Sequence, residues 1–446
     1  MITLRHNSAI NPRQNGLSLD LEPCPTVMTG GLSAFGDYWI EISPTPPREM
    51  IVNPNKPPYR VPLMSEIRAL PWNGFKVAST FSGCGGSSTG YRMAGFKVVW
   101  ASEFIDSARE TYMANCDPLT IVDGRDIRQV KAEEILSATG LAVGELDLLD
   151  GSPPCASFST AGKRESGWGK VKKYSDKAQR TDDLFFEFTR LLAGLKPKTF
   201  VAENVSGLVK GTAKGYFLEI LAALKASGYR VTCRVLDAQW LGVPQQRQRT
   251  IFVGVREDLN LEPVHPSPLT YRYSVRDALP WIVNQIQGAG EGINPNKPGN
   301  TFPRNHEVSP DLPCGAVTAQ SGQVNAAPFL IEAETDISRY AIGAEWDKTP
   351  IGGASERFFS LVKPCPSKPC PTIQASHGGS SIAGVVHPIE KRKFTIAELR
   401  RICAFPDDFI LCGSYAQQWE RLGRAVPPVM MCAVAETIRD KILGKL

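Results

Sequence analysis

A cysteine follows two prolines at the end of an apolar run, in the segment LDLLDGSPPCASFST at residues 146–160. Pro153 and Pro154 lack an amide donor and fix their own backbone angles, so they turn the chain out of a sheet and hold the thiol of Cys155 in one place. A thiol presented in this way suits nucleophilic chemistry, in which the thiolate is the reactive form. A loop cysteine that only packs is the alternative, because free cysteine often behaves as a small hydrophobic residue. This segment alone leaves both interpretations open.

A candidate acid ends another apolar run, in VAENVSG at residues 201–207. A carboxyl group at the rim of a buried strand should have a raised pKa. Glu203 is therefore predicted to donate a proton to a ring nitrogen, or to share one with it. A glutamate that caps the following helix is the alternative.

Three long polar side chains, those of Gln245, Arg247 and Arg249, alternate in VPQQRQRTIFVGV at residues 243–255. Alternate residues of a strand share one face, so we expect these three side chains to lie together. Arginines that lead into a buried apolar run need partners. A flipped base or its phosphates would serve, and local carboxylates are the alternative for one of the arginines.

A glycine loop at residues 81–86, FSGCGG, joins a predicted strand to a predicted helix. Gly83 and Gly86 let the backbone pass close to a ligand at the carboxyl edge of a sheet. Glu103, about 20 residues later, ends the next strand, where an acid binds ribose hydroxyls in nucleotide folds, and Asp126 is placed to contact an adenine amino group. The loop is short and no phosphate-binding residue is evident, which favours a cofactor without phosphate such as S-adenosylmethionine. A tight turn with a solvated glutamate is the alternative.

These groups need a scaffold, and strands alternate with helices from about residue 75 to residue 256. Apolar strands that alternate with helices predict an α/β fold with a mostly parallel sheet covered on both faces. The predicted strands are 75–81, 96–102, 119–122, 146–151, 198–204, 229–238 and 250–255, and the main predicted helices are 87–95, 105–115, 131–138, 182–195 and 214–226.

The composition divides the chain into four parts. Residues 1–73 are rich in Pro and Asn and are expected to form an extension, partly disordered or draped over the body. Residues 74–258 are the predicted catalytic domain. Residues 259–393, dense in Gly, Pro, Asn and Ser, are a loop-rich or β-rich module, and a helical pattern returns at 394–446.

Overall composition is that of an ordinary soluble protein, with 42% hydrophobic and 21% charged residues among 446. No apolar run is long enough to span a membrane, and the N-terminus lacks a secretory signal. Eleven irregularly spaced cysteines do not indicate a disulfide framework, so a reducing cytoplasm is expected. Cys365, Cys370, His377 and His387 lack the spacing of a zinc finger, and no metal site is predicted.

The positive charge is concentrated in one segment. Residues 163–180 contain seven Lys or Arg residues against two acidic ones, so this segment carries +5, as much as the whole chain. Such a segment, so soon after Cys155, suggests a polyanionic substrate held through its phosphates. A solvated surface loop is the alternative.

Five motifs, FSGCGG, GSPPCASFS, AENV, PQQRQR and GRAVPP, occur in an order that resembles the DNA (cytosine-5)-methyltransferases, over about residues 75–256 and 390–446. The resemblance implies a Rossmann-like methyltransferase fold with a mixed sheet and a target-recognition domain inserted at 259–393. It implies that Cys155 attacks carbon 6 of a flipped cytosine in double-stranded DNA and that Glu203 engages the base. Gln245, Arg247 and Arg249 match the family's Q-x-R-x-R, so Arg247 and Arg249 are implied as catalytic residues, and Arg249 contacts the target base.

The same resemblance implies S-adenosylmethionine as the cofactor. The positions that match the family's cofactor contacts are Phe81, Gly83, Gly86, Glu103, Phe104, Asp126, Ile127, Pro154 and Val426. The sequence departs from the family at Arg424, which replaces the asparagine of the usual G-N-A-V near the methionine end of the cofactor. A monomer is expected, without a membrane partner, in a prokaryotic or viral setting and with a possible cognate restriction endonuclease.

Three other functions remain as alternatives. A tRNA cytosine-5 methyltransferase shares the scaffold and favours Pro-Pro-Cys, but that branch lacks a module as large as 259–393. A catalytically silent DNA-binding regulator is disfavoured by intact Cys155 and Glu203, although Arg424 argues weakly for it. A nicotinamide oxidoreductase leaves Cys155 and the arginines without a role.

Overall fold

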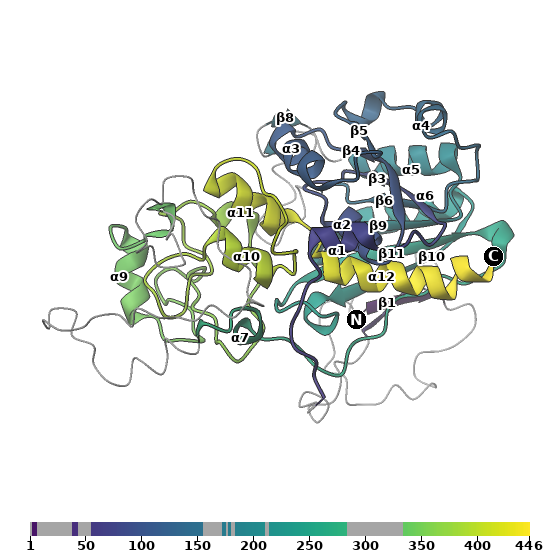
Figure 1. Cartoon of the computed structure of the whole chain (residues 1–446). Coiled ribbons are helices and arrows are strands. Elements are labelled where there is room, and N and C mark those ends of the chain that lie inside the picture. Colours follow the sequence, from purple (N-terminus) through teal and green to yellow (C-terminus); the bar gives the residue numbers. More distant parts are fainter. Residues whose placement is uncertain are drawn as a thin grey trace, which may run out of the picture.

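The chain forms an α/β body with a smaller lobe beside it, as the computed structural model shows (Figure 1). The structure describes residues 2–6, 38–42, 55–154, 172–174, 177–179, 183–209, 214–282 and 333–446. Cys155 and most of the basic segment 163–180 lie outside the described residues, as does much of the module at 259–393.

A mixed sheet forms the centre of the body, and its nine described strands run in the order β2-β1-β10-β11-β9-β6-β3-β4-β5. The five strands from β9 to β5 are parallel, whereas β11, β10, β1 and β2 continue the sheet in antiparallel pairs. The strands are β1 (Ile2–His6), β2 (Tyr38–Ile42), β3 (Lys76–Thr80), β4 (Lys97–Ser102), β5 (Ile121–Asp123), β6 (Leu148–Gly151), β9 (Thr199–Val205), β10 (Tyr229–Asp237) and β11 (Gln248–Arg256). A separate pair is formed by β7 (Lys172–Tyr174) and β8 (Lys177–Gln179). The predicted α/β class and mixed sheet are therefore confirmed.

Helices cover both faces of this sheet, because apolar side chains point to both sides of its central strands. One face is covered by the body helices α4, α5 and α6, whose side chains pack with Phe200 and Phe252. On the other face, α2 and α12 pack with Val77 and Ile251 of the sheet through side chains such as Tyr91 and Met430. The body helices are α2 (Gly86–Met93), α3 (Asp106–Asn115), α4 (Ala132–Thr139), α5 (Leu184–Leu195), α6 (Lys214–Ala226) and α12 (Pro428–Lys441).

The smaller lobe has its own apolar core, in which Phe394, Leu399 and Trp419 are buried. Its helices are α7 (Val275–Ala278), α9 (Ala341–Lys348), α10 (Ile396–Ile402) and α11 (Tyr415–Arg424). Helices α10 and α11 pack in this lobe, whereas α12 returns to the body beside α2 (Figure 1). Where exactly the domains divide stays a prediction.

The described parts of the N-terminal extension lie on the body and on the lobe. Strands β1 and β2 add to the sheet beside β10, which the sequence did not predict. Helix α1 (Met64–Ala69) buries Met64 and Ile67 in the core of the smaller lobe. Tyr59 donates its hydroxyl to the carbonyl of Arg401 at 2.6 Å. This segment thus fastens the chain that precedes β3 to the lobe.

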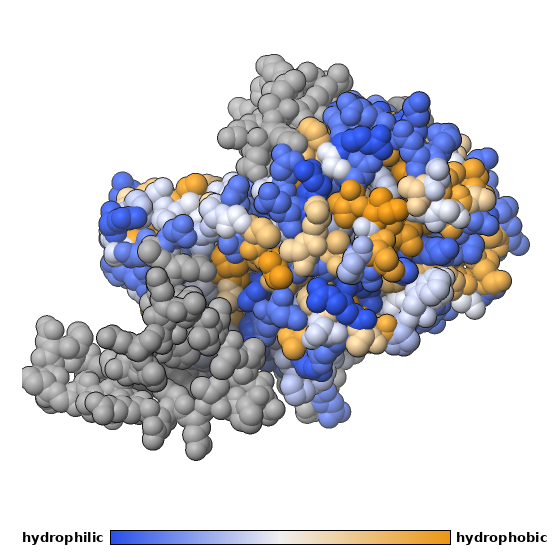
Figure 2. All heavy atoms as spheres, turned by 45° about the horizontal axis from the view of Figure 1, so that its top comes forward, coloured by the Kyte–Doolittle hydropathy of each residue, from blue (hydrophilic) through white to orange (hydrophobic). Residues whose placement is uncertain are grey.

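The surface shows the mixture expected of a globular protein, with hydrophilic residues interrupted by hydrophobic ones on the face seen in Figure 2. Within the described parts of the chain, every helix is too short or too polar to cross a membrane.

Gly254 on β11 offers a test of this sheet. A Cβ at Gly254 would lie 1.9 Å from Cε1 of Phe200, its buried partner on β9. Gly254→Ala should lower the free energy of unfolding by about 2 kcal/mol, because the closely packed ring cannot move away. Gly215→Ala on α6 is the control, since no atom lies within 4 Å of its Cβ; it should raise stability by about 0.5 kcal/mol. Urea unfolding measures both, and equal stability of the two variants would contradict this packing.

Candidate active site

A cavity of about 1350 Å³ opens where the parallel strands end, between the body and the smaller lobe. The carboxyl ends of parallel strands meet at one edge of a sheet, which brings residues far apart in the sequence together. Segments 372–376 and 420–426 of the lobe form the facing wall. The predicted site residues that line the cavity are Phe81, Gly83, Gly86, Glu103, Phe104, Asp126, Ile127, Pro154, Glu203, Arg247, Arg249 and Val426.

The glycine loop forms a tight turn that a buried carboxylate holds in place. Gly83 and Gly85 adopt positive φ angles of 56° and 94°, which suit glycine. Glu103 accepts an N–H from Gly83 at 2.8 Å and another from Ile105 at 2.7 Å. Burial raises the pKa of Glu103, and these two amide donors oppose the rise. The alternative of a solvated glutamate is therefore wrong, since this side chain is buried and bonded to the loop.

The start of α2 packs tightly against the chain that joins α11 to α12. A Cβ on Gly86 would lie 2.2 Å from the carbonyl oxygen of Val426. A glycine is therefore required at this position for the lobe-side segment to approach the loop. This contact places Val426 beside the glycine loop. Its role in cofactor binding stays a prediction.

The residues around the loop fit a nucleoside cofactor. The wall combines acceptor carboxylates, from Glu103 and Asp126, with the apolar surfaces of Phe104, Ile127 and Pro154. Acceptors suit ribose hydroxyls and an amino group, and apolar surfaces suit a purine ring. The acceptor carboxylates, the apolar surfaces and the shape of the loop are therefore compatible with S-adenosylmethionine.

The proline elbow before Cys155 is tied to the neighbouring strand. Gly151 of β6 pairs with Ala202 of β9, so the two strands end side by side. Asn204, buried at the end of β9, donates its amide to the carbonyl of Pro153 at 3.2 Å and accepts the N–H of Val205 at 2.8 Å. No role was predicted for Asn204 from the sequence, although its place in the AENV motif was a signal for one. The chain is described up to Pro154, so the position of Cys155 stays a prediction.

Glu203 forms a buried ion pair with Arg249. Nε of Arg249 lies 2.7 Å from Oε1 of Glu203, and the two side chains are 11% and 9% exposed. Burial raises the pKa of Glu203, while Arg249, Arg247 and Ser152 limit the rise. The predicted raised pKa therefore has a physical basis in this structure. The side chain does not serve as the helix cap that was the alternative.

The three polar residues of the PQQRQR motif do not share one strand face, so that prediction is wrong. Strand β11 begins at Gln248, and only Arg249 of the three lies within it. The backbone before the strand pairs with the smaller lobe instead: the N–H of Gln246 bonds to the carbonyl of Cys370 at 2.7 Å, and the N–H of Cys370 to that of Pro244 at 2.9 Å. Gln245 and Arg247 therefore belong to a segment that pairs with the smaller lobe before the strand begins.

Arg247 joins the body to the smaller lobe. Its side chain is 1% exposed, and its guanidinium donates to the carbonyl of Ile373 at 3.3 Å and to those of Gly423 and Ala425 at 2.8 Å each. Burial and then the charge of Arg249 lower the pKa of Arg247 to about 9. Gln245 donates to the sulfur of Cys403 at 3.4 Å. Both side chains thus serve the contact between the lobes.

Arg424, the departure from the family pattern, lies at the end of α11 and lines the cavity. Its Nε lies 2.7 Å from Oε1 of Glu420, which lines the cavity as well. The carbonyls on either side of Arg424 accept the bonds from Arg247. The backbone of this segment is therefore held independently of the side chain at position 424.

The four Cys and His residues considered for zinc do not form a ligand cluster. Nδ1 of His387 accepts the N–H groups of Ile389 and Glu390 at 3.3 and 2.9 Å. Across the described ranges, which include all four residues, no group of three or more His, Cys, Asp or Glu side chains could hold a metal ion.

Comparison with known families identifies the class of this chain. The family described as C-5 cytosine-specific DNA methylase matches residues 75–440. The chain therefore belongs to the C-5 cytosine-specific DNA methylases, and the resemblance drawn from its five motifs is confirmed.

Individual relatives and solved structures agree with this assignment. The chain is 30% identical to the Type II methyltransferase M.DdeI of Desulfomicrobium norvegicum, over 81% of this chain and 88% of that protein. It is 31% identical to M.FnuDI of Fusobacterium nucleatum, over 83% and 96% respectively. A crystal structure of a DNA modification methyltransferase encoded within an E. coli prophage has the same fold, with a TM-score of 0.58 and 20% identity over 83% of this chain and all of that one.

Asp150, on β6 behind the cavity, makes folding depend on pH. It is 1% exposed and accepts hydrogen bonds from Ser79 Oγ at 2.8 Å and from the Tyr91 hydroxyl at 3.1 Å. Burial raises the pKa of Asp150 to about 7, although these bonds lower it. The folded protein therefore keeps a proton that the unfolded chain releases near pH 4, and the contribution of Asp150 to stability falls as the pH rises from 4 to 7.

Asp150→Asn should remove this dependence. The variant should gain stability relative to the parent protein as the pH rises from 5 to 8, by up to about 3 kcal/mol, because the difference grows by about 1.4 kcal/mol per pH unit up to pH 7. Asp440→Asn, at an exposed ion pair with Arg439, is the control and should leave the slope unchanged. Urea unfolding between pH 5 and 8 measures the difference, and parallel pH profiles for Asp150→Asn and the parent would contradict the assignment.

Proposed function

We propose that this protein transfers a methyl group from S-adenosylmethionine to carbon 5 of a flipped-out cytosine in a specific double-stranded DNA sequence, through a covalent adduct between Cys155 and carbon 6. The observation that carries the proposal is the buried Glu203–Arg249 pair, which lies on the same cavity as the proline elbow and the glycine loop. One acid, one elbow leading to a nucleophile and one nucleoside-binding loop are what this reaction requires.

Cys155, Glu203 and Arg249 have separate roles in this reaction. Carbon 5 of cytosine is a poor nucleophile. Addition of the Cys155 thiolate to carbon 6 breaks the conjugation of the ring and makes carbon 5 enamine-like, so that carbon 5 can accept a methyl group. Glu203, whose pKa is raised by burial, donates a proton to N3 as the bond between sulfur and carbon 6 forms. After carbon 5 is methylated, its proton passes to water and the bond between sulfur and carbon 6 breaks, which releases the thiolate. The proton on N3 then returns to the Glu203 carboxylate, which restores both residues. Arg249 holds the Glu203 carboxyl in place and contacts the base.

The cofactor would supply an electrophilic methyl group when bound. Glu103 would bind the ribose hydroxyls and Asp126 the adenine amino group, and the other predicted cofactor residues are Phe81, Gly83, Gly86, Phe104, Ile127, Pro154 and Val426. Glu103 already fixes the glycine loop through Gly83, so loss of its carboxylate affects both the loop and the cofactor.

We assign DNA binding to residues 259–393 as the target-recognition domain, with 74–258 and 394–446 as the catalytic domain and 1–73 as the N-terminal extension. The basic segment 163–180 would bind phosphates and help to offset the few kcal/mol needed to flip a base. Arg247 contributes by joining the lobes. The relatives named Type II methyltransferases support a restriction-modification setting. We propose, as expected from the sequence, a monomeric enzyme of the cytoplasm with a possible cognate restriction endonuclease.

Labelled cofactor tests this function directly. Incubation with labelled S-adenosylmethionine should transfer label to mixed genomic DNA and not to total tRNA, and bisulfite sequencing should locate it at one short recurring motif.

Cys155→Ser should abolish transfer while the protein still binds S-adenosylmethionine, and DNA with 5-fluorocytosine should trap the parent protein covalently. Label in tRNA alone would favour the RNA methyltransferase, and normal turnover by Cys155→Ser would remove the thiolate from the mechanism.

The acid can be tested separately. Glu203→Gln keeps the size and a hydrogen bond but cannot donate the proton, so kcat should fall by about 100-fold or more. Binding of S-adenosylhomocysteine should be unchanged. Glu262→Gln, in an exposed pair with Arg230, is the control and should keep the parent kcat. An unaltered kcat in Glu203→Gln would show that this carboxyl does not act as the acid.

A further inference from the structure

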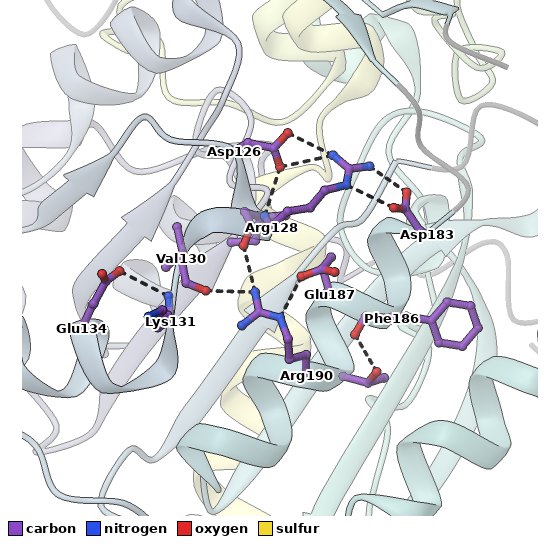
Figure 3. A network of polar contacts seen from close by, with 11 residues as sticks. Asp126, Arg128, Val130, Lys131, Glu134, Asp183, Phe186, Glu187 and Arg190 are labelled. Atoms are coloured by element: carbon purple, nitrogen blue, oxygen red, sulfur yellow. Dashed lines mark hydrogen bonds and ion pairs between the residues drawn. The ribbon is translucent and has the colours of Figure 1, made fainter. Parts of the chain in front are cut away.

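Arg128 connects the cofactor side of the cavity to helix α5. It follows β5 in the short 3-10 helix Ile127–Gln129, whose first turn is capped by the carboxylate of Asp126. Figure 3 shows the guanidinium between two carboxylates, that of Asp126 on one side and that of Asp183 on the other. The five motifs of the family resemblance gave Arg128 no role.

The contacts to the two carboxylates differ. Nε and Nη2 of Arg128 donate to the two oxygens of Asp183 at 3.1 and 2.7 Å, a bidentate arrangement. Nη1 donates to both oxygens of Asp126, at 3.0 and 3.2 Å, and the backbone N–H of Arg128 donates to one of them at 3.0 Å. Asp126 is therefore held by three donated bonds, all from Arg128, and Arg128 is anchored on Asp183.

Asp183 occupies the N-cap position of α5 but does not cap the helix with its side chain. An aspartate at this position normally accepts a hydrogen bond from a helix N–H. The Asp183 side chain makes no such capping bond, and its carboxylate faces Arg128 instead. The carboxylate of Asp183 therefore anchors Arg128 and does not bond to the first turn of α5.

A second arginine fastens the same short helix to α5. Nη2 of Arg190 donates to the carbonyls of Ile127 and Val130 at 2.9 Å each, and its Nε donates to Glu187 at 2.8 Å (Figure 3). Helix α5 is itself firmly packed, with Phe185 and Phe188 in the core of the body. The segment that carries Asp126 follows an edge strand of three residues, so it takes its position from α5 through these two arginines.

We propose that Arg128 is a positioning residue for cofactor recognition: by bridging Asp126 to Asp183, it orients the Asp126 carboxylate toward the adenine amino group. This inference rests on the proposed function, in which Asp126 binds that group. A carboxylate discriminates an amino group from a carbonyl oxygen only while it is fixed as an acceptor, because a mobile side chain would turn away from the repulsive oxygen.

Binding of two nucleosides tests the role of Arg128. S-adenosylhomocysteine carries the amino group, whereas S-inosylhomocysteine carries an oxygen in its place. The parent protein should bind the adenosyl compound at least about tenfold more tightly by calorimetry. Arg128→Gln should lose most of this preference, through weaker binding of the adenosyl compound alone. Asp183→Asn keeps a side chain able to cap α5 but removes the anchor, and it should narrow the preference by about threefold.

Arg230→Gln is the matched control, because Arg230 has a similar exposure and bridges Glu262 and Asn260 away from the cavity. It should keep the parent preference. Equal weakening of both compounds in Arg128→Gln, or an unchanged preference in both variants, would overturn the positioning role while leaving the proposed function intact. If Arg128→Gln does not fold, Asp183→Asn decides the question alone. Failure of the parent protein to bind S-adenosylhomocysteine would overturn the proposed function and this inference with it.

Discussion

The buried guanidinium of Arg247 holds together the two halves of the cavity. It belongs to the chain that enters β11 in the body, yet its three carbonyl acceptors lie on two segments of the smaller lobe, at Ile373 and on either side of Arg424. A buried charged donor without acceptors is strongly unfavourable, so these carbonyls must stay where they are. The lobe-side wall of the cavity, and the Val426 carbonyl against Gly86, depend on that constraint.

A second buried arginine, Arg249, lies close enough to Arg247 for the two positive charges to repel one another. Burial, followed by the charge of Arg249, lowers the pKa of Arg247, and burial also lowers the pKa of Arg249. The charge of Glu203 opposes the fall of both pKa values. Glu203 in turn has a pKa raised by burial and limited by Arg249. The three groups therefore restrain one another, and a carboxyl that can exchange a proton is kept at the end of β9 with a defined orientation.

The body side of the cavity is built on carboxylates that fix the backbone. Glu103 binds two amides of the glycine loop and of the approach to α3, and Asp126 caps a short helix while it faces Arg128. Asn204 fixes the carbonyl of Pro153 in a similar way. Each of these side chains lies at or just after the carboxyl end of a parallel strand, so the strand order sets which of them meet. The smaller lobe supplies the opposite wall, and the chain before β3 is fastened to that lobe through Tyr59 and helix α1.

The sequence by itself determined the strands and helices of the body from β3 onwards, and which residues gather at the cavity. Strand and helix periodicity is a local property, so helix 214–226 was predicted with its observed bounds, and the carboxyl ends of parallel strands must converge. Only the tertiary structure decided what Gln245 and Arg247 contact, that Asn204 binds Pro153, that Asp183 serves Arg128 instead of its own helix, and that β1 and β2 extend the sheet. The reason is that these contacts join residues tens to hundreds of positions apart. Their partners are set by packing between elements, which no local pattern of residue types encodes.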